Sequence, residues 1–136
     1  MSWIVIIIAL GILIALHELG HYGLARLLGM KVMKYSIGFF KPIFSWTSAK
    51  SDITYQIGAI PLGGFVQIKG MNPFEEGAFE APDSYQMQST WKRGLVIIAG
   101  PVANLLIAWV ILFTLVAGVG FPNELTAVVG YEERKP

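Results

Sequence analysis

Cysteine is absent from this 136-residue sequence, and charged residues are scarce, at 14% of the chain. Without cysteine there is neither a disulfide bond nor a thiolate metal site, so a metal ion would need nitrogen and oxygen ligands. The formal net charge is only +1, and the Lys and Arg residues are spread along the chain rather than gathered into a basic face. We therefore expect no nucleic acid among the partners of this protein.

Hydrophobic residues make up 54% of the chain and concentrate in two long runs, residues 3–28 and 95–121. As a helix, each run would be roughly 40 Å long, enough to cross a hydrocarbon core of about 30 Å with some tilt. The first run lacks the basic start and the small-residue cleavage pattern of a secretory signal peptide. The sequence therefore predicts an α-helical integral membrane protein with two transmembrane helices.

Most lysine and arginine residues lie between the two apolar runs, and none precedes the first run. Because positively charged loops stay on the cytoplasmic side, residues 29–93 are predicted to be cytoplasmic and both termini extracytoplasmic. We expect a multi-pass protein of the cell inner (plasma) membrane. Residues 1–121 would form its membrane-embedded core, and residues 122–136 would begin an extracytoplasmic segment that leads to a further C-terminal part.

Residues 32–69, between the two runs, are predicted to form a β element. The stretch ITYQIGAI (residues 53–60) alternates apolar and polar residues, the pattern of a strand with one apolar face. The preceding stretch MKYSIGFFKPIFSW is apolar and aromatic, and SAKSD between the two has turn composition, so we expect a β-hairpin, cytoplasmic or membrane-reentrant. FVQIK, after PLGG, is a candidate third strand, whereas the polar, turn-rich residues 70–91 are predicted to form a loop.

The pattern His17-Glu18-x-x-His21 lies within the first predicted helix. Histidines four residues apart project from one face of a helix, where two imidazoles can share one metal ion. Glu18 follows the first histidine directly, the place of a base that takes the proton as a zinc-activated water attacks a peptide carbonyl. Because ionisable groups inside membrane helices are costly, two core histidines without a metal are the weaker interpretation. The motif predicts a zinc peptidase, with His17 and His21 as ligands and Glu18 as general base.

Small residues and one amide stand near this site in the two predicted helices. Gly20 and Gly23 favour close packing of a neighbouring helix over a water-lined cavity. Pro101 is predicted to lie near the start of the second helix, where proline costs little. Asn104 is the one amide of the second apolar run and is expected to face protein, where an interhelical hydrogen bond would satisfy it.

In their order along the chain, HELGH, YSIGFF, IPLGGFVQIKG and AGPVAN resemble the N-terminal part of site-2 proteases, the intramembrane zinc metalloproteases of regulated intramembrane proteolysis. The chain is most similar to the bacterial regulator of sigma E protease type. The resemblance implies Zn²⁺ as the cofactor, with His17 and His21 as ligands and Glu18 as catalytic base. It also implies a transmembrane protein substrate in the lipid bilayer, such as an anti-sigma factor or a signal-peptide remnant.

The same resemblance implies that the β element is membrane-reentrant and receives the substrate in extended form. An exposed strand edge can pair with an unfolded segment through main-chain hydrogen bonds, which supports this role independently. A hairpin that only caps the helices is the alternative. Gly63, Gly64 and Asn104 are the candidates for substrate binding or support of the core.

The sequence also departs from this family. The third zinc ligand of site-2 proteases is an aspartate in a Leu-Asp-Gly type motif on a later membrane helix, and no such motif occurs here. Because a catalytic zinc site normally has three protein ligands, we expect the isolated chain to be inactive. Relatives often show Gly-Phe-Gly where this chain has Gly38-Phe39-Phe40. A non-catalytic membrane scaffold or a metal-binding subunit is the alternative function.

Overall fold

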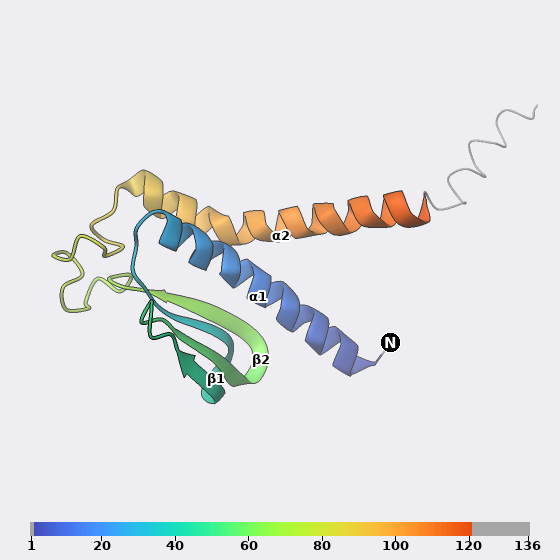
Figure 1. Cartoon of the computed structure of the whole chain (residues 1–136), viewed down its shortest axis with the longest axis horizontal. Helices are drawn as coiled ribbons and strands as arrows, with labels where there is room; N and C mark the ends of the chain where they lie inside the picture. Colours follow the sequence, from blue (N-terminus) through green and yellow to red (C-terminus); the bar gives the residue numbers. More distant parts are fainter. Residues whose placement is uncertain (1, 121–136) are drawn as a thin grey trace, which may run out of the picture. The chain divides into compact units, whose positions relative to one another are not determined.

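The computed structural model of the chain describes residues 2–120, so the predicted extracytoplasmic segment 122–136 lies outside the described residues. The elements follow in the order α1 (Trp3–Leu27), β1 (Val32–Thr47), β2 (Thr54–Ile68) and α2 (Thr90–Val119) (Figure 1). The predicted fold of two long apolar helices joined by a β-hairpin is confirmed. The chain divides into two compact units, Met1–Asn104 and Leu105–Pro136, and the candidate site lies entirely in the first.

Helix α1 ends in a glycine-terminated cap that turns the chain toward the hairpin. Gly29 has φ 83°, the left-handed conformation that glycine adopts without steric cost. The Met30 N–H donates to the Ala25 carbonyl at 2.9 Å, and the Gly29 N–H donates to the Arg26 carbonyl at 3.1 Å. These two bonds form a Schellman motif. The helix therefore ends at Leu27, one residue before the predicted boundary.

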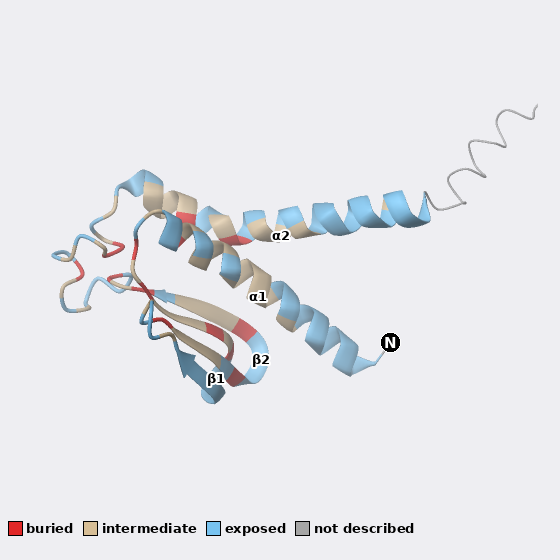
Figure 2. Cartoon of the chain, in the orientation of Figure 1, coloured by how far each residue is buried: buried red, intermediate tan, exposed pale blue. Residues whose placement is uncertain are grey.

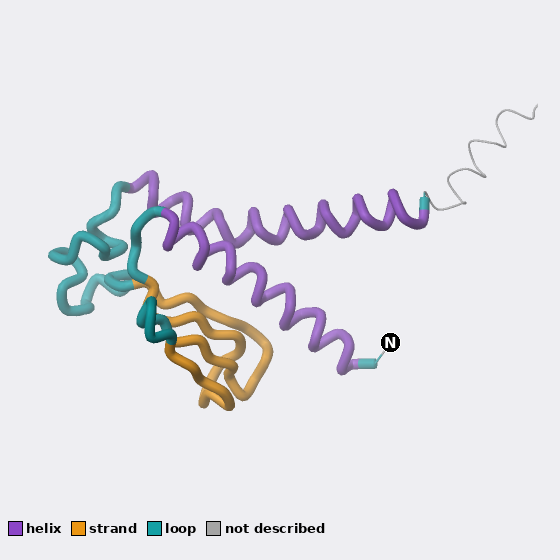
Figure 3. The backbone as a smooth tube through the Cα atoms, in the orientation of Figure 1, coloured by secondary structure: helices purple, strands orange, loops and turns teal. Residues whose placement is uncertain are grey.

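The antiparallel strands β1 and β2 are long and bent, so different segments of each strand pair with one another. Lys34 of β1, for example, has partners at both Gln67 and Thr54 of β2. Residues 64–68 pair only with the start of β1, and residues 42–47 of β1 pair only with the start of β2, so these two segments are the outer edges. Figure 3 shows the strand segments in orange. The predicted third strand, FVQIK, is the last part of β2, because PLGG continues that strand instead of ending it.

Two residues in the left-handed region of backbone space bend β1. Gly38 has φ 86°, and a Cβ atom there would lie 2.8 Å from the Ile60 carbonyl oxygen. Phe40 has φ 67° although it is not glycine, and its side chain is 76% exposed. This backbone conformation costs an L-residue roughly 1–2 kcal/mol. The departure from Gly-Phe-Gly thus falls at a position whose backbone favours glycine.

The buried core lies at the base of the hairpin, where it joins the helix ends and the loop (Figure 2). The loop between β2 and α2 is tied to this base by the Lys31 N–H, which donates to the Asp83 carbonyl at 2.9 Å, and by an ion pair of 3.3 Å between Lys69 and Asp83. The core thus holds the hairpin against the second half of α1. Its buried members are Ala25, Met30, Val32, Ile53, Ile68, Tyr85 and Val96.

Helix α2 begins at Thr90, five residues before the apolar run that predicted it. The residues that precede the run are polar but still helical, because hydropathy marks only the apolar part of a helix. As a result Pro101 lies inside the helix and not near its start, which corrects the prediction. Proline has no N–H, so the Ile97 carbonyl lacks its helical donor. By length and composition, both α1 and α2 are apolar enough to cross a membrane.

Candidate metal centre

The helical spacing of α1 brings the two histidine rings together. The rings of His17 and His21 meet edge to face, with centroids 4.9 Å apart and an interplanar angle of 80°. Their Nε2 atoms lie 3.2 Å from each other. Two of the predicted site residues therefore present the same ring nitrogen to one point in space.

The other ring nitrogen of each histidine contacts α2. His21 Nδ1 lies 2.7 Å from the backbone carbonyl oxygen of Val96, and a carbonyl can only accept, so Nδ1 carries the proton and donates. That tautomer leaves the lone pair of His21 on Nε2. His17 Nδ1 lies 3.1 Å from the side-chain amide nitrogen of Asn104. Metal-binding histidines are usually held in this way, by a partner on the nitrogen that does not face the metal.

Glycine allows α2 to pass close to the histidines. A Cβ atom on Gly100 would lie 2.6 Å from His17 Nε2 and would overlap His21 Nε2 as well. On the opposite helix, a Cβ atom on Gly20 would lie 2.9 Å from the Ala103 side chain. The predicted packing role of Gly20 is therefore borne out, whereas Gly23 has no neighbour that a Cβ atom would meet within 4 Å.

The donor set fits a zinc ion. In a tetrahedral site with Zn–N bonds of 2.0–2.1 Å, two imidazole nitrogens stand roughly 3.3–3.4 Å apart, close to the separation of the two Nε2 atoms. Zinc sites accept nitrogen and oxygen ligands, and both histidines have their other nitrogen in contact with a partner. Within residues 2–120, no group of three or more His, Cys, Asp or Glu side chains is placed to hold a metal ion. His17 and His21 thus have the chemistry and the spacing expected of two ligands of a catalytic zinc site.

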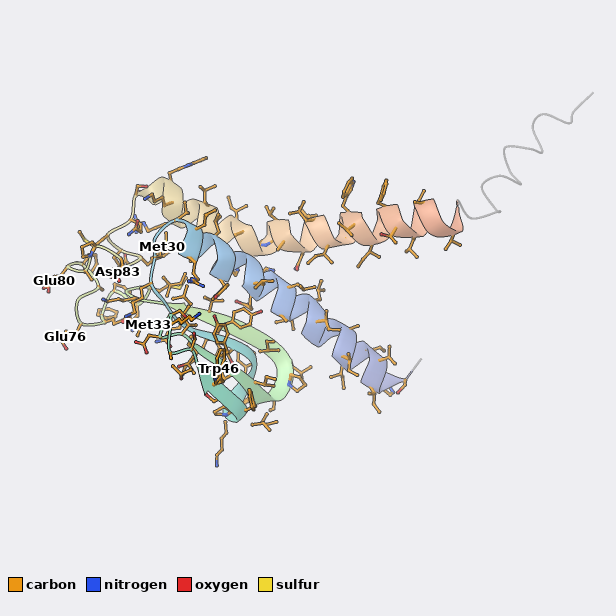
Figure 4. The ribbon with its side chains drawn as sticks, in the orientation of Figure 1. Met30, Met33, Trp46, Glu76, Glu80 and Asp83 are labelled. Atoms are coloured by element: carbon orange, nitrogen blue, oxygen red, sulfur yellow. The ribbon has the colours of Figure 1, made fainter. Side chains whose placement is uncertain are left out.

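The acidic residues of the loop do not supply a third ligand. Figure 4 shows Glu76, Glu80 and Asp83 on the loop between β2 and α2. Asp83 pairs with Lys69 there. Within residues 2–120, these loop acids do not gather with the two histidines of α1 into a group that could hold a metal ion.

Glu18 lies between α1 and the outer segment of β2, where it lines two cavities. One cavity has a volume of about 320 Å³ and is lined by His21, Val66, Met71 and other mostly apolar residues. The other, of about 350 Å³, is lined by His17, Asn104 and the apolar side chains of both helix and hairpin. Both cavities include Glu18 and Gly64. The glutamate therefore borders two spaces beside the histidine pair.

The glycines of PLGG let β2 run next to Glu18. A Cβ atom on Gly64 would lie 3.0 Å from Glu18 Cγ and 2.8 Å from the Ser36 carbonyl oxygen. A Cβ atom on Gly63 would overlap the ring of Phe39. Together with Asn104, both glycines line the second cavity, so the three candidates for substrate binding or support of the core lie around one space.

Tyrosines join the hairpin to α1 beside the site. The Tyr35 hydroxyl donates to the backbone carbonyl of Ala15, two residues before His17. Burial, with an added contribution from the charge of Glu18, raises the pKa of Tyr35 to about 12, so this donor stays protonated at physiological pH. Tyr22 and Tyr55 share a hydrogen bond of 2.7 Å between their hydroxyls. These contacts fix the position of β1 and β2 along the helix that carries the motif.

Reasoning from the sequence missed three contributors to this site. Gly100 stands within the quoted AGPVAN, and its position next to a proline was the only signal available. The Val96 partner is a backbone carbonyl, which any residue type would provide. Tyr35 was part of an aromatic strand with nothing to mark its contact with Ala15.

Comparison with known proteins identifies the family. Residues 5–133 match the sequence profile of Peptidase family M50. The chain belongs to this family. The predicted resemblance to site-2 proteases is thereby confirmed.

The names of several curated relatives describe them as zinc metalloproteases. The chain is 42% identical over 132 residues to the zinc metalloprotease Rip1 of Mycobacterium tuberculosis, an alignment that covers 93% of this chain and 32% of that protein. It is 43% identical over 122 residues to a putative zinc metalloprotease of Vibrio cholerae, which covers 89% of this chain and 26% of the relative. These names support the predicted metalloprotease class and zinc as cofactor. The chain spans about a third or less of the length of these relatives.

Proposed function

We propose that this chain provides the general base and two zinc ligands of a zinc-dependent intramembrane endopeptidase. The observation that carries the proposal is the facing pair of Nε2 atoms on His17 and His21, with Glu18 between the two histidines in the sequence and open to two cavities. A third ligand would come from outside residues 2–120. In this proposal residues 1–121 form the membrane-embedded core.

Each residue of the motif has a separate task. Zinc, when bound, polarises the scissile carbonyl and makes water more acidic. His17 and His21 hold the ion through Nε2, and their Nδ1 partners on α2 keep the rings oriented. Glu18 accepts the proton of the attacking water and delivers it to the leaving amide nitrogen, so that the peptide bond breaks to a carboxylate and an amine.

The exposed surface supports a place in the bilayer. The apolar side chains of α1 are exposed along its first half, and Trp3 is 79% exposed. The far end of the hairpin also exposes apolar side chains, with Ile43 75% exposed. Lipid is the solvent in which such surfaces are stable. We propose a multi-pass protein of the inner membrane, with residues 29–93 cytoplasmic, the hairpin partly embedded and both termini extracytoplasmic.

The outer segment of β2 is the proposed substrate-binding edge. Residues 64–68 pair with β1 on one side only, and Gly64 places this segment next to Glu18. A substrate strand added there would find main-chain partners for the backbone groups that it exposes on unwinding. The substrate would be a transmembrane segment of a membrane protein, such as an anti-sigma factor or a signal-peptide remnant.

The proposal is tested by Glu18→Gln in the full-length protein. Glutamine keeps the size of the side chain but cannot accept the proton, so we expect cleavage of a membrane substrate to fall by about 100-fold or more. Zinc content, measured by metal analysis, should stay at the level of the unsubstituted protein. His21→Ala should instead lose zinc and cleavage together, because it removes a ligand.

Glu80→Gln is the matched control, since it makes the same chemical change on the loop between β2 and α2. It should leave both cleavage and zinc content unchanged. Substantial cleavage by Glu18→Gln would refute the general base. Zinc content that does not change in His21→Ala would refute the metal site and favour a non-catalytic scaffold.

A further inference from the structure

The amide of Asn104 is only half satisfied in its buried position beside His17. Its Nδ2 lies 3.1 Å from His17 Nδ1, but its Oδ1 is buried and has no hydrogen-bond partner among the described residues. A buried acceptor without a donor loses the hydrogen bonds that it would make in water, so this arrangement is unfavourable. This orphaned oxygen indicates that the amide has a second arrangement in the working site.

The orientation of this amide is linked to the tautomer of His17. With Nδ2 toward the ring, the amide donates, so His17 Nδ1 is bare and the proton sits on Nε2. The Nε2–H then points at His21 Nε2, 3.2 Å away, which is free to accept because His21 carries its proton on Nδ1. This chain of hydrogen bonds is consistent only without a metal, since His17 Nε2 then carries a proton and the lone pair of His21 Nε2 accepts it.

A half-turn of the amide about its Cβ–Cγ bond reverses this assignment. Oδ1 then faces His17 Nδ1 and accepts its proton, which gives the orphaned oxygen a donor. The lone pair of His17 moves to Nε2 and faces that of His21. Two lone pairs directed at one point repel each other unless a cation lies between them.

We propose that Asn104 is a positioning residue that holds His17 as a zinc ligand by accepting its Nδ1–H through Oδ1. The proposal rests on the proposed zinc site and adds a residue to it. In this arrangement both histidines donate Nδ1–H to α2, His21 to the Val96 carbonyl and His17 to the Asn104 side chain. Such partners typically contribute 10–100-fold to metal affinity.

Zinc dissociation constants of the full-length protein in detergent test this assignment. Asn104→Leu removes the acceptor and should weaken zinc binding on the order of 10–100-fold. Asn104→Asp keeps an oxygen acceptor but cannot donate, so its affinity should stay within about threefold of the parent, or be higher. Thr114→Val is the matched control on α2, because its hydroxyl donates only to the Val110 carbonyl of the same helix.

A second measurement follows the proton itself. Imidazole ¹⁵N labelling of the full-length protein, with the signals of His17 and His21 assigned by substitution of each histidine, provides this readout. In the zinc-loaded protein the Nδ1 proton of His17 should show the downfield shift of a strong hydrogen bond, retained in Asn104→Asp and lost in Asn104→Leu. A shift that stays unchanged in Asn104→Leu overturns the proposal.

Two further outcomes overturn it. One is an Asn104→Leu protein that binds zinc as tightly as the parent, and the other is a loss of tenfold or more in Asn104→Asp. If Asn104→Leu does not fold, Asn104→Ala replaces it, because it also removes the acceptor and should show the same loss of zinc affinity. Failure of the zinc site itself is distinguished by His21→Ala, because zinc content unaffected by that substitution refutes the site whatever the Asn104 variants do.

Discussion

At the scale of single residues, the geometry of the candidate metal centre depends on a glycine as much as on the two histidines. Gly100 has no chemistry of its own, yet a Cβ atom there would lie 2.6 Å from His17 Nε2. The nitrogens that face each other on α1 therefore have α2 directly against them. A site of this kind needs the smallest residue at the crossing, because any side chain would displace the rings.

Gly100→Ala should consequently impair metal binding without weakening the helix. Alanine is favoured over glycine inside a helix by roughly 1 kcal/mol, so α2 itself is expected to be no less stable. The added methyl group displaces both imidazoles, and we expect zinc affinity to fall on the order of tenfold or more. Equilibrium zinc titration of the purified protein measures this.

Gly94→Ala is the control for this substitution. Gly94 lies in the same helix, and a Cβ atom there would meet nothing within 4 Å. Its zinc affinity should match that of the parent. Equal affinity of Gly100→Ala and the parent would contradict the close packing of α2 on the histidine pair.

At the scale of elements, the hairpin places a strand edge beside α1, the helix that carries the His17-Glu18-x-x-His21 motif. The edge exists because β2 continues through PLGG to Ile68, and because its last residues pair with the start of β1 alone. Tyr35 and Tyr22 join this hairpin to α1, which holds the edge in register with Glu18. The outer segment of β2 therefore lies next to Glu18, whereas the outer segment of β1 lies on the opposite edge of the sheet.

Cysteine cross-linking distinguishes the two outer segments, and the absence of native cysteine makes each introduced thiol unique in this chain. Phe65 lies on the outer segment of β2 and lines the cavity that contains Glu18. In an inactive Glu18→Gln background, Phe65→Cys should form a disulfide with a cysteine placed near the scissile bond of the substrate. Non-reducing electrophoresis detects the product.

Phe44→Cys is the matched control, since it makes the same change on the outer segment of β1, away from Glu18. It should cross-link weakly or not at all. Equal cross-linking from both positions, or stronger cross-linking from position 44, would rule out the outer segment of β2 as the substrate-binding edge.

The elements also show where a hydropathy pattern misplaces a boundary. The apolar run predicted a helix from residue 95, but the polar residues from Thr90 onward are helical too. Pro101 consequently lies within the helix, three residues before Asn104. Hydropathy reports which solvent a segment prefers, whereas helix limits depend on backbone hydrogen bonds that polar residues form equally well.

At the scale of the whole molecule, the number of metal ligands limits what residues 2–120 provide. His17 and His21 offer two ligands, and no group of three candidate ligands is formed within residues 2–120. We expect this chain, expressed by itself, to insert as a two-span hairpin, to show no peptidase activity and to hold zinc weakly. The loop acids are no substitute, because their charges would have to enter the bilayer.

Supplying a further membrane helix with an aspartate in a Leu-Asp-Gly type motif should restore both zinc affinity and cleavage, since that carboxylate completes the open site. Metal analysis and a cleavage assay on a membrane substrate check both parts. Cleavage by residues 1–136 alone that Glu18→Gln abolishes would place the third ligand within this chain.

The sequence by itself determined the class of chemistry, the two apolar helices and the hairpin. Histidines four apart on a helix share one face, and an alternating pattern favours a strand, so local geometry was enough to predict His17, Glu18 and His21 as the candidate site. Only the tertiary structure decided what faces the other nitrogens of the rings. The Val96 carbonyl and the Asn104 side chain contact these nitrogens where α2 crosses α1, and Gly100 allows that close crossing. Such contacts join residues that are far apart in the sequence, so no local sequence pattern predicts them.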